Sequence, residues 1–209
     1  MAAVCYNENI AREGRFTVRK NFFGREDMAL KDYIDMKPTI GTERLTIRPL
    51  CADDVPALRE WMSEPSIYTY WGKGPGRADK DPALLFEKKG RPTKSFHLGI
   101  EEKASGKVIG ELYIYRIIND RTATAAIRLA PGVQGRGYGT EALCAMTRFC
   151  FERTELKRLY AEVDLRNIPS QRMLEKCGFQ REKLVSQGKM VSTLCDYYLY
   201  ALSSAAERE

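Results

Sequence analysis

Hydrophobic and polar residues alternate with a period of two along much of the chain, which is the pattern of half-buried β-strands. The longest alternating stretches are 95–102, 108–118 and 122–129, and turn-forming residues at 104–107 and 119–121 separate them. Because such short connections join antiparallel neighbours, we expect three consecutive antiparallel strands. Four more stretches look strand-like: 45–48, 158–165, 179–185 and 193–201. The pattern therefore predicts a sheet of about seven strands.

Helical patterns separate several of these strands. Asp53 or Asp54 can cap a helix that runs to about Met62, and Pro56 is tolerated in its first turn. Gly178 is a natural end for the last helix. The other predicted helices are 25–36, 83–89, 141–153 and 169–178. This mixture predicts an α/β (α+β) fold in which helices flank a mixed, mostly antiparallel sheet.

The chain divides near Pro38 and Gly41, which interrupt the regular patterns. Its 209 residues are enough for one large domain, or for one domain with an appendage. Residues 1–37 are interpreted as an N-terminal extension and residues 38–209 as a single domain. The chain shows no internal repeat.

Composition excludes several classes of protein. No apolar run approaches the roughly 20 residues of a membrane-spanning helix, and no signal-peptide core is visible, so we expect a cytoplasmic protein. Six scattered cysteines and a single histidine give no metal-site spacing, so no metal is expected. The net charge of +6 suits an anionic ligand. Because that charge is spread along the chain, a nucleic-acid surface is not indicated.

A glycine-rich turn, QGRGYG at 134–139, lies between the strand-like stretch 122–129 and the predicted helix 141–153. Unpaired backbone N–H groups and the helix dipole make such a turn a phosphate site. Glycine lets the backbone approach a ligand closely. The sequence contains no nucleoside-triphosphate P-loop and no G-x-G-x-x-G dinucleotide fingerprint. The turn therefore predicts a different phosphate-bearing ligand.

This turn resembles the Q/R-x-x-G-x-G/A motif of GNAT acyltransferases. Leu129 and Pro131 before it, the N-x-x-S at 167–170 and the EKCGF at 175–179 follow in the family's order. The opening TERLTIRPL at 42–50 is similar to the start of the ribosomal-protein N-terminal acetyltransferase branch. Together these motifs cover about residues 42–200.

The resemblance implies an acetyl-CoA (coenzyme A) cofactor held in a splayed cleft of the sheet. The strand 122–129 is expected to carry a bulge that frees an N–H near Leu129 to polarise the thioester carbonyl. Backbone groups of Leu129 and Pro131 would pair with the pantetheine arm. The expected cofactor-binding residues are Leu129, Pro131, Gln134, Gly135, Arg136, Gly137, Tyr138, Gly139, Thr140, Asn167 and Ser170. For Ser170, a role as a helix cap remains an alternative.

The usual catalytic acid and base of the family are missing. Leu174 occupies the position of a tyrosine acid, and the strand 122–129 holds no carboxylate. Glu111 on the neighbouring strand is the predicted base, with an ion pair to Arg128 as the alternative. Ser170 or water could serve as the acid. His97 is interpreted as structural rather than catalytic.

The predicted function is acetyl transfer from acetyl-CoA to a primary amine, either a protein N-terminus or a small-molecule amine. The loop 64–77, rich in glycine and aromatic residues, is placed by the resemblance at the acceptor pocket, where Tyr68, Trp71 and Tyr113 would bind substrate. A homodimer is possible. Two alternatives remain open: a non-catalytic acyl-CoA-binding module, and an acyltransferase that acts on charged tRNA.

Overall fold

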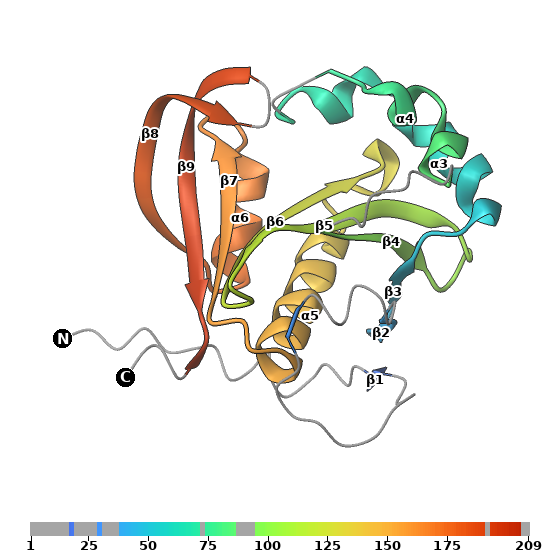
Figure 1. Ribbon diagram of the computed structural model, residues 1–209. Coiled ribbons are helices and arrows are strands. Elements are labelled where there is room, and N and C mark those ends of the chain that lie inside the picture. Colours follow the sequence, from blue (N-terminus) through green and yellow to red (C-terminus); the bar gives the residue numbers. More distant parts are fainter. Residues whose placement is uncertain are drawn as a thin grey trace.

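The computed structural model describes residues 17–18, 29–30, 38–71, 74–86, 95–190 and 193–205. In this part of the chain nine strands form one sheet in the order β1-β2-β3-β4-β5-β6-β7-β9-β8 (Figure 1). The strands are β1 (Thr17–Val18), β2 (Ile40–Gly41), β3 (Leu45–Pro49), β4 (Phe96–Glu102), β5 (Val108–Ile118), β6 (Thr122–Leu129), β7 (Arg158–Asp164), β8 (Gln180–Met190) and β9 (Thr193–Ser203). The predicted mixed, mostly antiparallel sheet is confirmed, and two short strands, β1 and β2, raise its number of strands above seven.

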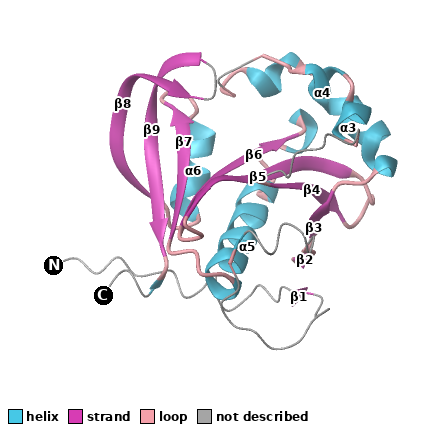
Figure 2. Cartoon of the chain, in the orientation of Figure 1, coloured by secondary structure: helices cyan, strands magenta, loops and turns pink. Residues whose placement is uncertain are grey.

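Helices cover both faces of this sheet (Figure 2). The two longest are α5 (Tyr138–Arg153) and α6 (Ile168–Lys176), which match the predicted helices 141–153 and 169–178 to within three residues. The predicted helix from Asp53 or Asp54 to Met62 is observed as α3 (Val55–Met62), and α4 (Arg77–Lys80) is a single turn. The predicted helix 83–89 is only a 3₁₀ turn, Pro82–Leu85, in its described part. The predicted helix 25–36 lies almost entirely outside the described residues.

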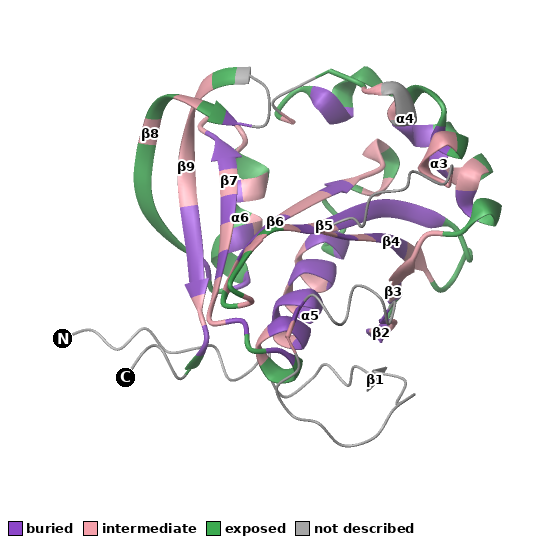
Figure 3. Cartoon of the chain, in the orientation of Figure 1, coloured by how far each residue is buried: buried purple, intermediate pink, exposed green. Residues whose placement is uncertain are grey.

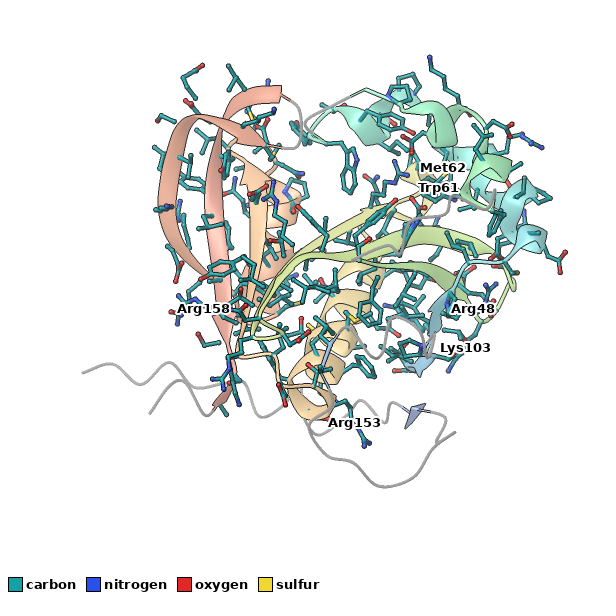
Figure 4. The ribbon with its side chains drawn as sticks, viewed as in Figure 1. Arg48, Trp61, Met62, Lys103, Arg153 and Arg158 are labelled. Carbon is teal, nitrogen blue, oxygen red and sulfur yellow. The ribbon has the colours of Figure 1, made fainter. Side chains whose placement is uncertain are left out.

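The main core lies between the sheet and α5 (Figure 3). Along α5 the buried residues Ala142, Ala145, Met146 and Phe149 follow a helical period, and the alternate strand residues facing them include Leu112. A second cluster on the other face packs α3 against the sheet. Its members include Leu58, Trp61, Met62, Ile67, Tyr68 and Val108. Trp61 donates its indole N–H to the Val108 carbonyl at 3.1 Å, and Figure 4 labels Trp61 and Met62 beside α3.

Two neighbouring strands separate in the middle of the sheet. β6 and β7 are parallel, and their register contains only the pairs Thr122↔Arg158, Ala123↔Leu159 and Thr124↔Tyr160. Beyond Thr124, β6 continues paired with β5 as far as Leu129, while β7 pairs with β9 along its whole length. The second half of β6 therefore presents one edge without a strand partner, and the expected splayed cleft is formed here.

Part of the expected N-terminal extension contacts the domain. Thr17–Val18 pairs with β2 at the edge of the sheet, and Leu30 is completely buried in the main core. The boundary at residue 37 stays a prediction. The contacts of Leu30 nevertheless make this residue part of the packing that supports α5 and the sheet.

Replacing Leu30 by alanine is expected to lower the free energy of unfolding by about 2–5 kcal/mol, because the change leaves a cavity in a closed core. Denaturant unfolding measures this loss. The matched control is Leu194→Ala on β9, where the side chain is 66% exposed and a change within about 0.5 kcal/mol is expected. Equal effects of the two substitutions would show that residue 30 is not part of the core.

Candidate active site

The glycine-rich turn presents exposed backbone at the start of α5. A 3₁₀ turn, Pro131–Val133, leads into it, and Gly135 and Gly137 take left-handed φ angles of 76° and 82°. These angles favour glycine. Gly137 is the N-cap of α5, and no side chain caps the helix there. Since the first N–H groups of a helix have no partner inside the helix, this end is open to an anion.

The helix begins at Tyr138, three residues earlier than predicted. The Tyr138 side chain turns away from the exposed turn: its hydroxyl bonds Glu102, and its ring lies 4.4 Å below the Arg44 guanidinium carbon. Tyr138 is one of the residues predicted to bind phosphate, and it can therefore offer an anion only its backbone amide. These distant contacts also explain the early helix start, because they anchor its first residue.

Glu141 lies in the first turn of α5, where residues from the segment before β3 bind its carboxylate. Its carboxylate accepts hydrogen bonds from the Thr42 hydroxyl at 2.6 Å, the Arg44 amide at 2.9 Å and the Arg44 Nε at 2.7 Å. Burial opposes ionisation, but these hydrogen bonds outweigh it and hold the pKa of Glu141 below its ordinary value. Arg44 also donates to the Arg136 carbonyl at 3.0 Å. The segment before β3 thus neutralises Glu141 and fixes the turn.

Gln134 closes the loop between β6 and the turn. Its side-chain amide donates to the Leu129 carbonyl at 3.0 Å, and its backbone N–H donates to the Pro131 carbonyl at 3.3 Å. Both carbonyls that were expected to pair with a ligand therefore already accept hydrogen bonds. The Ala130 N–H bonds Ile109, so the antiparallel register directs the Leu129 N–H to the opposite edge of β6, toward β7.

The expected bulge near Leu129 is absent. Pairing between β5 and β6 is unbroken from Gly110↔Leu129 to Tyr115↔Thr124, and the register shift lies between Tyr115 and Ile118 of β5. The prediction of a bulge in the strand 122–129 was wrong. Divergence of β7, rather than a bulge in β6, leaves the Leu129 N–H accessible.

A cavity of about 70 Å³ lies where β6 and β7 separate. It is lined from both sides of the sheet: by α5 and α6 on one side, and by the segment after α3 on the other. The lining residues are Tyr70, Trp71, Ala125, Ala126, Ile127, Leu143, Ala161, Glu162, Val163, Asp164, Asn167, Ser170, Met173 and Leu174. The opening in the sheet therefore connects the turn-and-helix side with the aromatic side.

Asn167 and Ser170 both reach this cavity from the start of α6. The Asn167 side chain is the N-cap, and it accepts the Ser170 N–H at 3.2 Å. Ser170 lies within the helix, so its alternative role as the cap is not what the structure shows. Leu174, at the position of the missing tyrosine, lines the same cavity and is buried.

Glu111 is completely buried on the face of the sheet opposite α5. It accepts a hydrogen bond from Arg128 Nε at 2.6 Å and one from the Tyr113 hydroxyl at 3.0 Å, and its other oxygen lies 2.5 Å from His97 Nε2. Arg128 also pairs with Asp79 of α4 at 2.6 Å. The alternative of an ion pair with Arg128 is thus what the structure shows, and a role of Glu111 as base stays a prediction.

Charged partners keep Glu111 ionised. Burial alone would raise its pKa, but the hydrogen bond and charge of His97 and the charge of Arg128 outweigh it, so the pKa is lowered from 4.5. Burial and the charge of Glu111 raise the pKa of Tyr113, which keeps its proton. Both Glu111 oxygens are engaged, so this carboxylate is poorly placed to accept a proton from an incoming amine.

The predicted acceptor residues divide into two groups. Trp71 lines the cavity, and its ring centroid lies 5.9 Å from that of Tyr113, which in turn stacks on His97 at 4.3 Å. Tyr68 is instead buried in the second core cluster, where its hydroxyl bonds the Met62 carbonyl at 2.7 Å. Tyr70, two residues later, lines the cavity. Binding of a substrate by any of these residues stays a prediction.

Glu162 on β7 was not among the residues predicted from the sequence. This residue lines the cavity, and its carboxylate contacts Arg116 of β5 at 2.5 Å through one oxygen. The other oxygen is buried and has no hydrogen-bond partner. Alternation along β7 places Glu162 on the same face as Tyr160 and Asp164. Sequence could therefore identify its face, but not the opening of the sheet beside it.

No helix among the described residues is long and apolar enough to cross a membrane. Nor does any group of three or more histidine, cysteine, aspartate or glutamate side chains in the described ranges have the arrangement needed to hold a metal ion.

Comparison with known proteins gives concordant results. Residues 44–180 match the model of the acetyltransferase (GNAT) domain. The N-acetyltransferase YnaD of Bacillus subtilis is 28% identical over 167 residues, covering 78% of this chain and 95% of YnaD. A GNAT-family acetyltransferase from Bacillus anthracis superimposes with a TM-score of 0.70 at 24% identity, over 82% of this chain and 99% of the other. Spermidine N-acetyltransferase from Vibrio cholerae, solved with CoA and spermine, gives 0.67 at 21% identity, over 79% and 99%.

The stability contributed by ionised Glu111 is expected to depend on pH. Because its folded-state pKa is below 4.5, this contribution is complete above pH 4.5 and is lost as pH falls through the lower folded value. Glu111→Gln should therefore cost about 3 kcal/mol at pH 7, the lower end of the range for breaking a buried ion pair, because Asp79 still partners Arg128. Denaturant unfolding at several pH values measures the difference, which should shrink below pH 4.5. The exposed Glu43→Gln is the control, and a constant difference at all pH values would contradict the ion-pair assignment.

Proposed function

The chain belongs to the GNAT family of N-acetyltransferases, and we propose that it transfers the acetyl group of acetyl-CoA to a primary amine in the cavity between β6 and β7. The observation that carries the proposal is the position of this cavity. It lies where β6 loses its pairing with β7, between α5 and α6 on one side and Tyr70 and Trp71 on the other. One buried carboxylate oxygen of its lining residue Glu162 has no hydrogen-bond partner.

The residues present fit coenzyme A. The exposed turn 134–137 and the uncapped start of α5 suit a pyrophosphate, since both offer unpaired backbone N–H groups and the helix dipole favours negative charge. The free edge of β6 suits the amide-rich pantetheine arm, which can pair with it like an added strand. Asn167 and Ser170 face the same space from α6. Coenzyme A is also present in the related spermidine acetyltransferase structure from Vibrio cholerae.

Acetyl-CoA supplies a thioester as the acetyl donor. In the proposed reaction, the Leu129 N–H stabilises the negative charge that develops on the carbonyl oxygen, a contribution typically worth about 2.7–4 kcal/mol. Leu174 and Met173 help to keep water from the reacting atoms. Ser170, which lines the cavity, or water is the proposed donor of a proton to the departing sulfur. Positioning accounts for much of the remaining rate enhancement.

We assign the acceptor amine to the aromatic side of the cavity. Tyr70 and Trp71 form its wall, and Glu162 provides a carboxylate that attracts a protonated amine. Such a site suits a primary amine on a small molecule or at a peptide terminus. A small-molecule acceptor is favoured by the kinship to spermidine N-acetyltransferases, one of which shares 24% identity over 140 residues.

An amine must lose its proton in order to attack a thioester. Glu162 fits this role better than Glu111, because one of its oxygens is unpartnered and the residue lines the cavity. The carboxylate first takes one proton from the bound ammonium group, and the neutral amine then attacks the thioester carbonyl. As the C–S bond breaks, a second proton passes from the nitrogen, through Ser170 or water, to the departing sulfur, so that coenzyme A leaves as the thiol and the amine keeps the acetyl group.

Mixing the protein with acetyl-CoA and an amine should release free thiol, and a panel of polyamines, N-terminal peptides and aminoglycosides should identify the acceptor. Gly137→Ala should raise KM for acetyl-CoA at least about tenfold, since a Cβ at φ 82° distorts the turn. Gly106→Ala is the matched control: Gly106 also has a positive φ, 67°, but lies in the β4–β5 turn. No thiol release with any amine would refute transferase activity toward that panel, and equal KM changes in both variants would refute the phosphate site.

The two candidate bases can be separated by substitution. Glu162→Gln should lower kcat by about 10²–10⁴-fold and leave binding of acetyl-CoA unchanged, because the residue acts on the amine. Glu111→Gln should reduce kcat much less, provided that the variant remains folded by circular dichroism. Steady-state kinetics at saturating donor measures both. Full activity of Glu162→Gln would exclude it as the base, and a large loss confined to Glu111→Gln would restore the original prediction.

A further inference from the structure

One bulge of this sheet lies on β5, where Arg116 contacts the cavity residue Glu162. Between the pairs Tyr115↔Thr124 and Ile118↔Thr122, β5 has two residues, Arg116 and Ile117, opposite a single residue of β6. A bulge redirects the side chains around it and is common next to active sites. Here it occurs at the level where β6 and β7 part.

Arg116 has an unusual backbone conformation at this bulge. Its φ angle is 51°, in the left-handed region, which costs energy for a residue with a long side chain. The other positive-φ residues that are not glycine, Asn119, Asp120 and Gln187, include two of the types that tolerate this region best. An arginine there calls for a compensating interaction of its side chain.

That interaction is with Glu162. Arg116 Nη1 lies 2.5 Å from one Glu162 oxygen, while the Glu162 side chain is only 11% exposed. The opposite oxygen is buried and has no hydrogen-bond partner. The Arg116 side chain, which is 47% exposed, thus approaches Glu162 from the solvent side and pairs with one of its two oxygens. The second oxygen of Glu162, which lines the cavity, is left without a partner.

We propose that Arg116 is a positioning residue for Glu162: the strained bulge aims the guanidinium so that it fixes the orientation of the carboxylate and leaves one oxygen free for the acceptor amine. This inference rests on the proposed function, in which Glu162 receives the proton. It adds that the bulge on β5 helps to determine the rate of the reaction.

Arg116 is the one cation found in contact with Glu162 among the described residues. Tyr115 of β5 and Tyr197 of β9 also face it, and their pKa values are raised by burial and by the Glu162 charge, so both are neutral at working pH. Asp164 on the same strand is ionised and paired with Arg166. From α6, Asn167 and Ser170 add only neutral dipoles. Removing the guanidinium therefore takes away the positive charge nearest to Glu162.

The test is the effect on kcat, compared with the effect on KM for acetyl-CoA, at saturating amine. A carboxylate that is no longer held in place takes the proton of the amine less effectively, so Arg116→Gln should lower kcat about tenfold and leave KM for acetyl-CoA unchanged. Arg116→Lys, which keeps the charge, should restore most of kcat. Gln and Lys leave the backbone at a comparable strain, so the difference between them isolates charge.

Two controls make the outcome decisive. Arg158→Gln removes a different arginine, on β7, from its ion pair with Glu182, with the same change in net charge, and should leave kcat unchanged. Thermal melting confirms that each variant is folded. If Glu162→Gln is inactive but Arg116→Gln and Arg116→Lys keep the wild-type kcat, Arg116 has no positioning role and the proposed function stands. If Glu162→Gln retains full activity, Glu162 is not the base, and the positioning role of Arg116 is overturned with it.

Discussion

The separation of β6 from β7 is the constraint on which the site depends. Three parallel residue pairs join these strands at one end, and the loss of pairing beyond them leaves a free strand edge in the interior of the sheet. A free edge with unsatisfied N–H groups is costly unless something pairs with it. The cavity, the outward-facing Leu129 N–H and the approach of α6 all follow from that opening. Without the divergence, the two faces of the sheet would be sealed from each other.

The glycine-rich turn is held by the segment that joins β2 to β3. Arg44 contacts Glu141, the Arg136 carbonyl and the Tyr138 ring, so a single side chain ties three parts of the turn together. Glu141 would repel a nearby phosphate if its charge were free. The Thr42 hydroxyl and the Arg44 amide donate hydrogen bonds to the Glu141 carboxylate and so offset that charge. Residues 42–44 therefore help to shape the proposed anion site, which lies some 90 residues later in the chain.

Local patterns predicted most of the fold and only part of the site. The strands 108–118 and 122–129 were placed correctly because alternation is a local property. The start of α5 was missed because Tyr138 is anchored by Glu102 and Arg44, which no local pattern reveals. The bulge was misplaced and Glu162 was overlooked for a related reason. A bulge is a mismatch between two strands, and the importance of Glu162 arises only where β7 leaves β6.

The cavity draws its walls from two independent sources, and this has an evolutionary consequence. Its donor side is built from β6, α5 and α6, whereas Tyr70 and Trp71 come from the segment between α3 and β4, outside the sheet. Substitutions in that segment leave every ladder hydrogen bond of β6 and β7 intact. Selection can therefore exchange one acceptor for another without rebuilding donor binding, so relatives that share this scaffold can diverge rapidly in the amines they modify.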